Sequence, residues 1–184
     1  MMKVNPIEII RKYYDQHSQA YEVLVVHSEM VKQKSLEFAE KVSHLNPDLQ
    51  FVEEAAMLHD IAIFLTHAPE IDCHGESPYI SHGPLGRELL EKEGLPRHAL
   101  VCDRHTGVGI SKKDVIEQKL PLPERDMLPV SIEEKIICFA DTFYRKNPDK
   151  LRQPKTIEMV EKKMATYGQN HLERVKSFRL LFSV

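Results

Sequence analysis

The chain has 184 residues, of which 42% are hydrophobic, and its 25 basic and 28 acidic side chains give a formal net charge of -3. This composition fits one globular domain with a hydrophobic core and does not favour a disordered chain. No Lys/Arg block is long enough to predict binding to a nucleic-acid polymer, and no apolar run approaches the roughly 20 residues that span a bilayer. The N-terminus is too polar for a signal peptide. We therefore expect a single domain over residues 1–184 of a cytoplasmic protein, and a homodimer remains open.

Helical spacing of apolar residues dominates, and no convincing alternating strand is present, so the predicted fold class is all-α. Asn5 and Pro6 predict the start of a short first helix. A long helix follows over 19–45 and is stopped by Asn46-Pro47. Its apolar stripe, on which His27 also falls, contains Leu24, Val31, Phe38, Val42 and Leu45.

The next helix is predicted to start at Asp48, and its helical spacing continues through His59 and Ala62 to Ile63. From His67 to Ser81 the composition becomes rich in Pro, Gly and charge, which predicts a loop. Short helices are expected over 82–94, 96–105 and 111–118. Ser131, with Glu134 three residues later, has the spacing of a capping box and begins a helix that leads to Asp141. Two amphipathic helices over 153–184 are predicted to close the bundle.

The stretch AAMLHDIAIF, residues 55–64, places His59 and Asp60 in an otherwise apolar run. Burial of two titratable groups costs several kcal/mol unless partners, a proton shift or a metal ion compensate them. The chain contains ten histidines, so a metal is the compensation to consider. The candidates in inward-facing or helix-terminal positions are His27, His59, Asp60, His82, His105 and Asp141.

Facing helices of a bundle can bring such distant ligands together into a two-metal site. Neutral imidazoles mixed with carboxylates suit Fe, Mn, Zn or Co better than Ca, and the lack of thiolates argues against a structural zinc site. Two ions about 3.5–4 Å apart can activate a water and hold the attacking and leaving oxygens of a phosphate. The pattern thus favours hydrolysis of a phosphate ester or anhydride.

The ordered segments HSEMV, MLHDIA, SHGPLG, DRHTG and FADTF closely resemble the HD-domain superfamily of metal-dependent phosphohydrolases over residues 20–145. The resemblance implies an HD-domain helical bundle with a binuclear metal site, in which Asp60 and His59 are the catalytic pair. The resemblance also implies a set of four ligands for one metal ion. His82 and His105 would be ligands of a second ion, which Asp60 would bridge to the first. The set for the first ion is His27, His59, Asp60 and Asp141.

Within the superfamily, HTG followed by EKII-x-x-AD is similar to the branch that hydrolyses symmetrical dinucleoside tetraphosphates with two iron ions. Iron is therefore the first candidate for the two divalent transition-metal ions, with manganese, zinc, cobalt or nickel as alternatives. The substrate implied is a small-molecule phosphate or nucleotide. Several HD enzymes carry a phosphate-contacting lysine where Ile63 stands here, so the sequence departs from that pattern. Arg87 and Arg104, close to ligands, could bind phosphate oxygens or only solvate their helices.

Several alternatives remain open. The enzyme could be an HD-type di-iron oxygenase, or the chain a non-catalytic module that senses a nucleotide. His98, Cys102 and His105 share a helix face and could hold zinc, although the outer pair is about 10 Å apart along the axis. Cys73 and His74 could bind a metal or form part of a lid in the 67–81 loop. Four histidines have no partner that spacing identifies and are expected at the surface or in caps: His17, His44, His67 and His171.

The three cysteines are odd in number and widely spaced, which favours reduced thiols over a disulfide framework. Cys138, inside IICFA, is expected to be a core residue.

Overall fold

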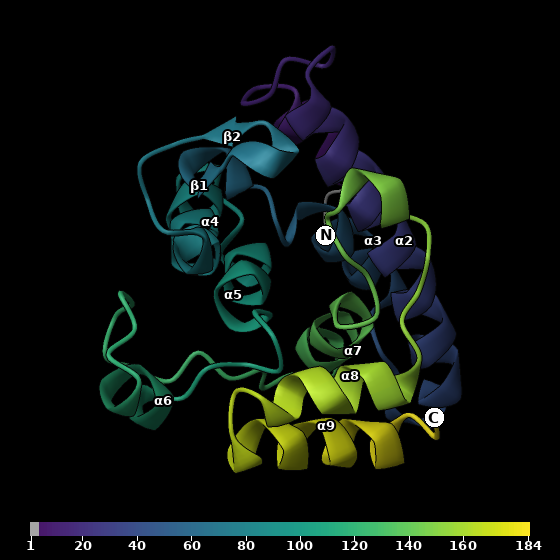
Figure 1. Cartoon of the computed structure of the whole chain (residues 1–184). Helices are drawn as coiled ribbons and strands as arrows, with labels where there is room; N and C mark the ends of the chain where they lie inside the picture. Colours follow the sequence, from purple (N-terminus) through teal and green to yellow (C-terminus); the bar gives the residue numbers. More distant parts are fainter. Residues whose placement is uncertain (1–3) are drawn as a thin grey trace.

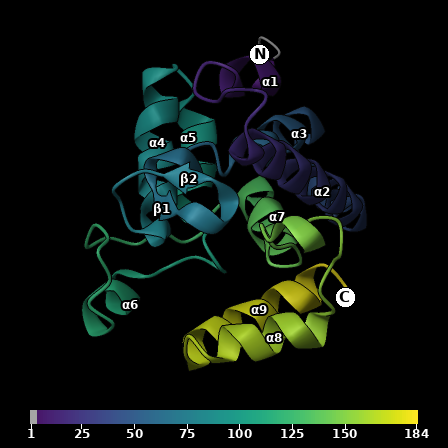
Figure 2. The ribbon, with the colours of Figure 1, turned by 45° about the horizontal axis from the view of Figure 1, so that its top comes forward.

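A computed structural model of the chain describes residues 4–184 and shows a bundle of α-helices, which confirms the predicted fold class (Figure 1). The helices are α1 Pro6–Ile10, α2 Gln19–Lys41, α3 Leu49–Leu58, α4 His82–Lys92, α5 Pro96–Arg104, α6 Lys112–Glu117, α7 Ile132–Asp141, α8 Ile157–Ala165 and α9 Gln169–Leu181. None of the helices in this described part is both long and apolar enough to cross a membrane. Figure 2 shows α6 at the edge, away from α2 and α7.

The helices begin where short polar side chains satisfy free backbone N–H groups. Asn5 accepts a hydrogen bond from the N–H of Glu8, and Asp48 accepts one from the N–H of Phe51. Ser131 accepts from the N–H of Glu134, as its spacing predicts. Loss of one such cap typically costs about 1 kcal/mol, so these residues contribute to setting the helix starts.

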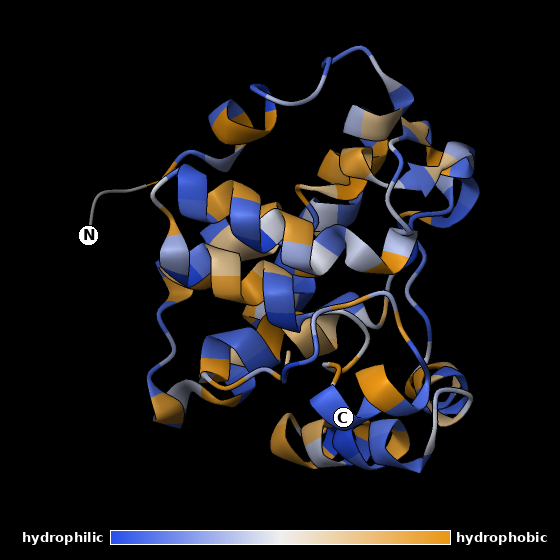
Figure 3. Ribbon diagram, turned by 90° about the vertical axis from the view of Figure 1, so that its left-hand side faces the viewer, coloured by the Kyte–Doolittle hydropathy of each residue, from blue (hydrophilic) through white to orange (hydrophobic). Residues whose placement is uncertain are grey.

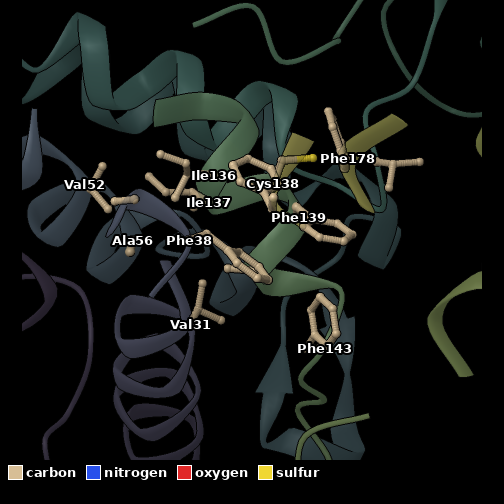
Figure 4. Close-up of a cluster of buried hydrophobic side chains, with 14 of the residues drawn as sticks. Val31, Phe38, Val52, Ala56, Ile136, Ile137, Cys138, Phe139, Phe143 and Phe178 are labelled. Carbon is tan, nitrogen blue, oxygen red and sulfur yellow. The ribbon is translucent and has the colours of Figure 1, made fainter. Parts of the chain in front are cut away.

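The helices pack through apolar faces that form two large clusters of buried side chains. Figure 3 shows apolar and polar residues alternating along the ribbons, as amphipathic helices require. In the first cluster, the ring of Phe139 on α7 lies 5.1 Å from that of Phe38 on α2 and 5.5 Å from that of Phe182, which follows α9. Phe178 of α9 joins the same cluster (Figure 4). The C-terminal hairpin of α8 and α9 is therefore attached to the core through α7.

The second cluster is formed mainly by side chains of the part of the chain from α1 to α5 and includes Leu24, Leu58 and Leu90. On α2, Leu24 belongs to this cluster and Val31 to the first one, while His27 lies between them. His27 is thus buried between two apolar clusters, where solvent screens its interactions with other charged groups poorly.

Four local expectations are wrong. The helix expected over 19–45 ends at Lys41, and Leu45 is 44% exposed because the chain passes into a 3-10 turn and then to left-handed Asn46. The helix after Asp48 ends at Leu58 rather than continuing through Ile63. The 67–81 loop contains a small antiparallel sheet of β1 His67–Ala68 and β2 Cys73–His74, too short to show alternation in the sequence. His171 is buried, because the first turn of α9 faces α6 and Asp114.

Candidate metal centre

The structure brings all six predicted metal ligands together at one place in the bundle. They form two groups whose candidate ligand atoms lie within 4.8 Å of one another, and the two groups share Asp60. The first group consists of His27, His59, Asp60 and Asp141, and the second of Asp60, His82 and His105.

The two oxygens of the Asp60 carboxylate face different groups. Its Oδ2 lies 3.2 Å from Nε2 of His27 and 3.0 Å from Nε2 of His59. Its Oδ1 lies 3.3 Å from Nε2 of both His82 and His105. A carboxylate in this position can bind one cation through each oxygen.

Asp141 completes the first group from the end of α7. Its Oδ1 lies 2.9 Å from Nε2 of His27 and 3.5 Å from Nε2 of His59. The second group has no further carboxylate ligand, so the first group offers four candidate ligands and the second three.

Local helix geometry explains how two of the histidines are held. His59 and His105 follow directly on the last residues of α3 and α5, where carbonyl groups have no partner inside the helix. Nδ1 of His59 donates to the carbonyl of Ala56 at 2.6 Å, and Nδ1 of His105 donates to that of Cys102 at 2.8 Å. Because Nδ1 holds the proton, Nε2 is the nitrogen left for a metal.

His82 begins α4 and follows the same rule, since its Nδ1 donates to the carbonyl of Tyr79 at 2.6 Å. Burial lowers the pKa of His82 to about 4, so the ring is neutral and its Nε2 carries a lone pair. This Nε2 lies only 3.2 Å from Nε2 of His105. In their neutral forms these nitrogens would repel each other and Asp60 Oδ1, and a cation between them removes that conflict.

Four buried atoms of the six candidate ligands have no hydrogen-bond partner among residues 4–184: His27 Nδ1, His59 Nε2 and both carboxylate oxygens of Asp60. Lys146 Nζ lies 2.6 Å from Asp60 Oδ2, but without the direction of a hydrogen bond. A buried polar atom without a partner costs about 1–3 kcal/mol, and a charged one costs more. These orphaned atoms and the donor set therefore fit a divalent transition-metal ion in each group.

Protonation competes with metal binding in the first group. Burial disfavours the charged ring of His59, but Asp60 and Asp141 outweigh that effect and raise its pKa to about 10. Burial likewise disfavours a charged Asp60, but His59 and Lys146 outweigh it and hold the pKa of this carboxyl well below its usual range. The centre thus keeps its carboxylate charge and attracts either protons or metal ions.

Two glycines let α4 approach α5 closely enough for His82 to face His105. A side-chain carbon added at Gly83 would lie 2.8 Å from the carbonyl oxygen of Cys102, and one at Gly86 would lie 3.0 Å from the Cβ of Cys102. Backbone lies in the way at Gly83, so a larger residue there would push the two helices apart.

The two predicted phosphate-contacting arginines are engaged with carboxylates. Arg87 contacts Glu91 at 2.8 Å and Asp103 at 3.3 Å. Arg104 donates from one nitrogen to both oxygens of Glu134, at 3.0 and 2.9 Å. These pairs give both arginines a structural role, and their contact with a substrate stays a prediction.

The alternative zinc ligands are not brought together. His98 Nε2 points to Glu54, 3.3 Å away, and Cys102 Sγ donates to the carbonyl of Leu58. Only His105 of that helix face reaches the metal centre. In the 67–81 loop, Cys73 is buried, whereas exposed His74 pairs with Asp72.

Sequence reasoning missed one charged residue at the centre, Lys146. It lies five residues after Asp141 on an irregular segment, so no helical spacing pointed to it. One feature of the sequence could have pointed to it. Ile63 stands where several HD enzymes carry a lysine, so another residue had to be sought as the cationic side chain of the site. Ile63 itself is fully buried among apolar neighbours.

Comparisons with known proteins identify one family and several relatives. The family model of the HD domain matches residues 24–146. An uncharacterized protein of Methanocaldococcus jannaschii is 34% identical over 125 residues, which cover 67% of this chain and 64% of that protein. The tRNA (cytidine(56)-2'-O)-methyltransferases of Thermoplasma volcanium and Picrophilus torridus are 28% and 32% identical, over 86% and 67% of this chain.

The matched part spans only 42% and 32% of those two methyltransferases. No solved structure matches the chain. The family match covers most of the chain and contains all six candidate ligands. The chain therefore belongs to the HD-domain superfamily, which is of the metal-dependent phosphohydrolase type.

Proposed function

We propose that this chain is a metal-dependent phosphohydrolase that cleaves a phosphate ester or anhydride bond in a nucleotide or a related small molecule. The observation that carries the proposal is the Asp60 carboxylate, which has one oxygen toward each group of histidine nitrogens and no hydrogen-bond donor on either. Two divalent ions bound there would supply an activated water and neutralise the charge of a phosphate.

The position of each side chain determines its role in the proposed reaction. Asp60 would hold both ions, and His59 would hold the first while its Nδ1–H keeps the ring fixed on the end of α3. In the overall reaction a new bond forms between phosphorus and the water oxygen, and the bond from phosphorus to the leaving group breaks. One proton of the water ends on the leaving group. The apolar clusters on both sides of His27 restrict the access of bulk water to the ligands.

The test is a phosphate-release screen with protein loaded with Mn or Fe, over mono-, di- and cyclic nucleotides and a symmetrical dinucleoside tetraphosphate. We expect release from at least one of these compounds, and none from the Asp60→Ala variant under the same conditions. His98→Ala is a matched control, because His98 is a buried histidine that pairs with Glu54 outside the centre. Release by this variant at the wild-type rate would show that loss of a buried histidine alone does not abolish activity.

Absence of release from every compound would contradict the proposal. Dioxygen consumption by the Fe-loaded protein would then indicate an oxygenase, the second kind of chemistry that a pair of iron ions supports. Binding of a nucleotide without turnover would indicate a sensing module.

A further inference from the structure

We propose that Lys146 is the residue that binds the phosphoryl group of the substrate, reaching the centre from the segment after α7. This inference rests on the proposed function and names a residue of the same site. The arrangement differs from HD enzymes in which the lysine lies three residues after the aspartate of the His-Asp pair, because that position is Ile63 here and belongs to an apolar cluster.

The first argument is access to the centre. The side chains of His27, His59, Asp60 and His105 are at most 1% exposed, and that of His82 is 4% exposed. Asp141 and Lys146 are each 15% exposed. Among the described residues of the centre, solvent therefore reaches it at Asp141 and Lys146, and a substrate entering there meets the ammonium group.

The second argument is the position of the charge. Lys146 Nζ lies 2.6 Å from Asp60 Oδ2, the oxygen that faces His27 and His59. A divalent ion held by the same oxygen would repel the ammonium, whose long flexible stem lets it move toward the open side. Two divalent ions would carry more positive charge than Asp60 and Asp141 neutralise. Lys146 adds to this excess of positive charge, which a bound phosphate anion would neutralise.

The third argument is the surroundings of the lysine. The ring centre of Tyr79 lies 5.9 Å from Lys146 Nζ, and the same ring lies 4.9 Å from that of His82. Tyr79 thus lies next to both Lys146 and His82 of the second ligand group, and its ring limits where the ammonium can move. This gives the end of the 67–81 loop a role in shaping the phosphate site.

The test measures binding of orthophosphate to the Mn-loaded protein by titration calorimetry, together with metal content by elemental analysis. Lys146→Met removes the charge and keeps the length of the stem. Because a hydrogen bond to a charged group contributes about 1.5–3 kcal/mol, we expect phosphate binding to weaken by about 10- to 100-fold. Lys146→Arg should retain most of the affinity. Lys150→Met, at an exposed lysine on the same segment, is the matched control and should leave it unchanged.

The metal content separates a substrate role from a structural one. In Lys146→Met it should stay at the wild-type value, because the lysine competes with an ion for Asp60 Oδ2 rather than supporting it. Unchanged phosphate affinity in Lys146→Met would overturn the inference, as would loss of metal from that variant. Failure of the wild-type protein to bind orthophosphate would also overturn it. The separate release screen decides the proposed function, so the two failures can be told apart.

Discussion

Removal of both histidines that face Asp60 Oδ1 should leave one ion per chain. In the double variant His82→Ala, His105→Ala the second group keeps only Asp60 of its three candidate ligands, whereas the first group keeps all four. Loss of a residue that merely orients a ligand costs about 10- to 100-fold in metal affinity, so loss of two direct ligands should cost at least about 100-fold. We expect the metal content to fall from two ions to one.

The assay is elemental analysis after equilibrium dialysis against limiting Mn or Fe, with circular dichroism as a check that the helices persist. His98→Ala is the control, because His98 lies on α5, which ends directly before His105, but points to Glu54. This control should keep both ions. A double variant that retains two ions, or a wild-type protein that never binds more than one, would refute the division into two groups. Hydrolysis should be largely lost in the double variant, because the phosphate needs both ions.

Three further outcomes are expected. Asp60→Ala should remove bound metal and activity together while the far-ultraviolet dichroism stays helical, and wild-type turnover in this variant would place the active centre elsewhere. Metal binds only neutral His59, whose pKa of about 10 exceeds its ordinary 6.5, so affinity should rise with pH from 7 toward 10 and binding should release about one proton. Calorimetry in buffers of different ionisation enthalpy measures that proton, and affinity independent of pH would contradict the expectation. Arg104→Ala should destabilise the fold by about 1–3 kcal/mol, because Glu134 is only 8% exposed and loses its cationic partner. A raised KM at unchanged melting temperature would instead show that Arg104 binds substrate.

The sequence predicted two kinds of feature correctly: those that depend on a few neighbouring residues, and those that depend on the order of the ligands along the chain. Helix starts at Asn5, Asp48 and Ser131 depend on a cap and a backbone N–H three residues away, so they can be read from a few letters. The convergence of His27 and Asp141, which are 114 residues apart, was accessible because their order in the chain resembles that of the HD superfamily.

The features that could not be predicted depend on tertiary geometry. The helix before His59 ends at Leu58, although the apolar spacing continues, because His59 itself turns back to bind the carbonyl of Ala56. Burial of His171 depends on how the C-terminal hairpin meets α6. Lys146 reaches Asp60 across 86 residues of sequence from a segment without regular structure, and no periodic pattern marks such a contact.

Three helices, α3, α5 and α7, end at the metal centre with their carboxyl ends toward it, because His59 and His105 follow α3 and α5 and Asp141 is the last residue of α7. Each helix carries roughly half a negative charge at that end, in addition to the charges of Asp60 and Asp141. An anion approaching the ion-free centre is therefore repelled by all five sources, and the opposing charges are Lys146 and the protonated ring of His59. The kinetic consequence that we expect is a preferred order of binding, in which the cations enter before a phosphate.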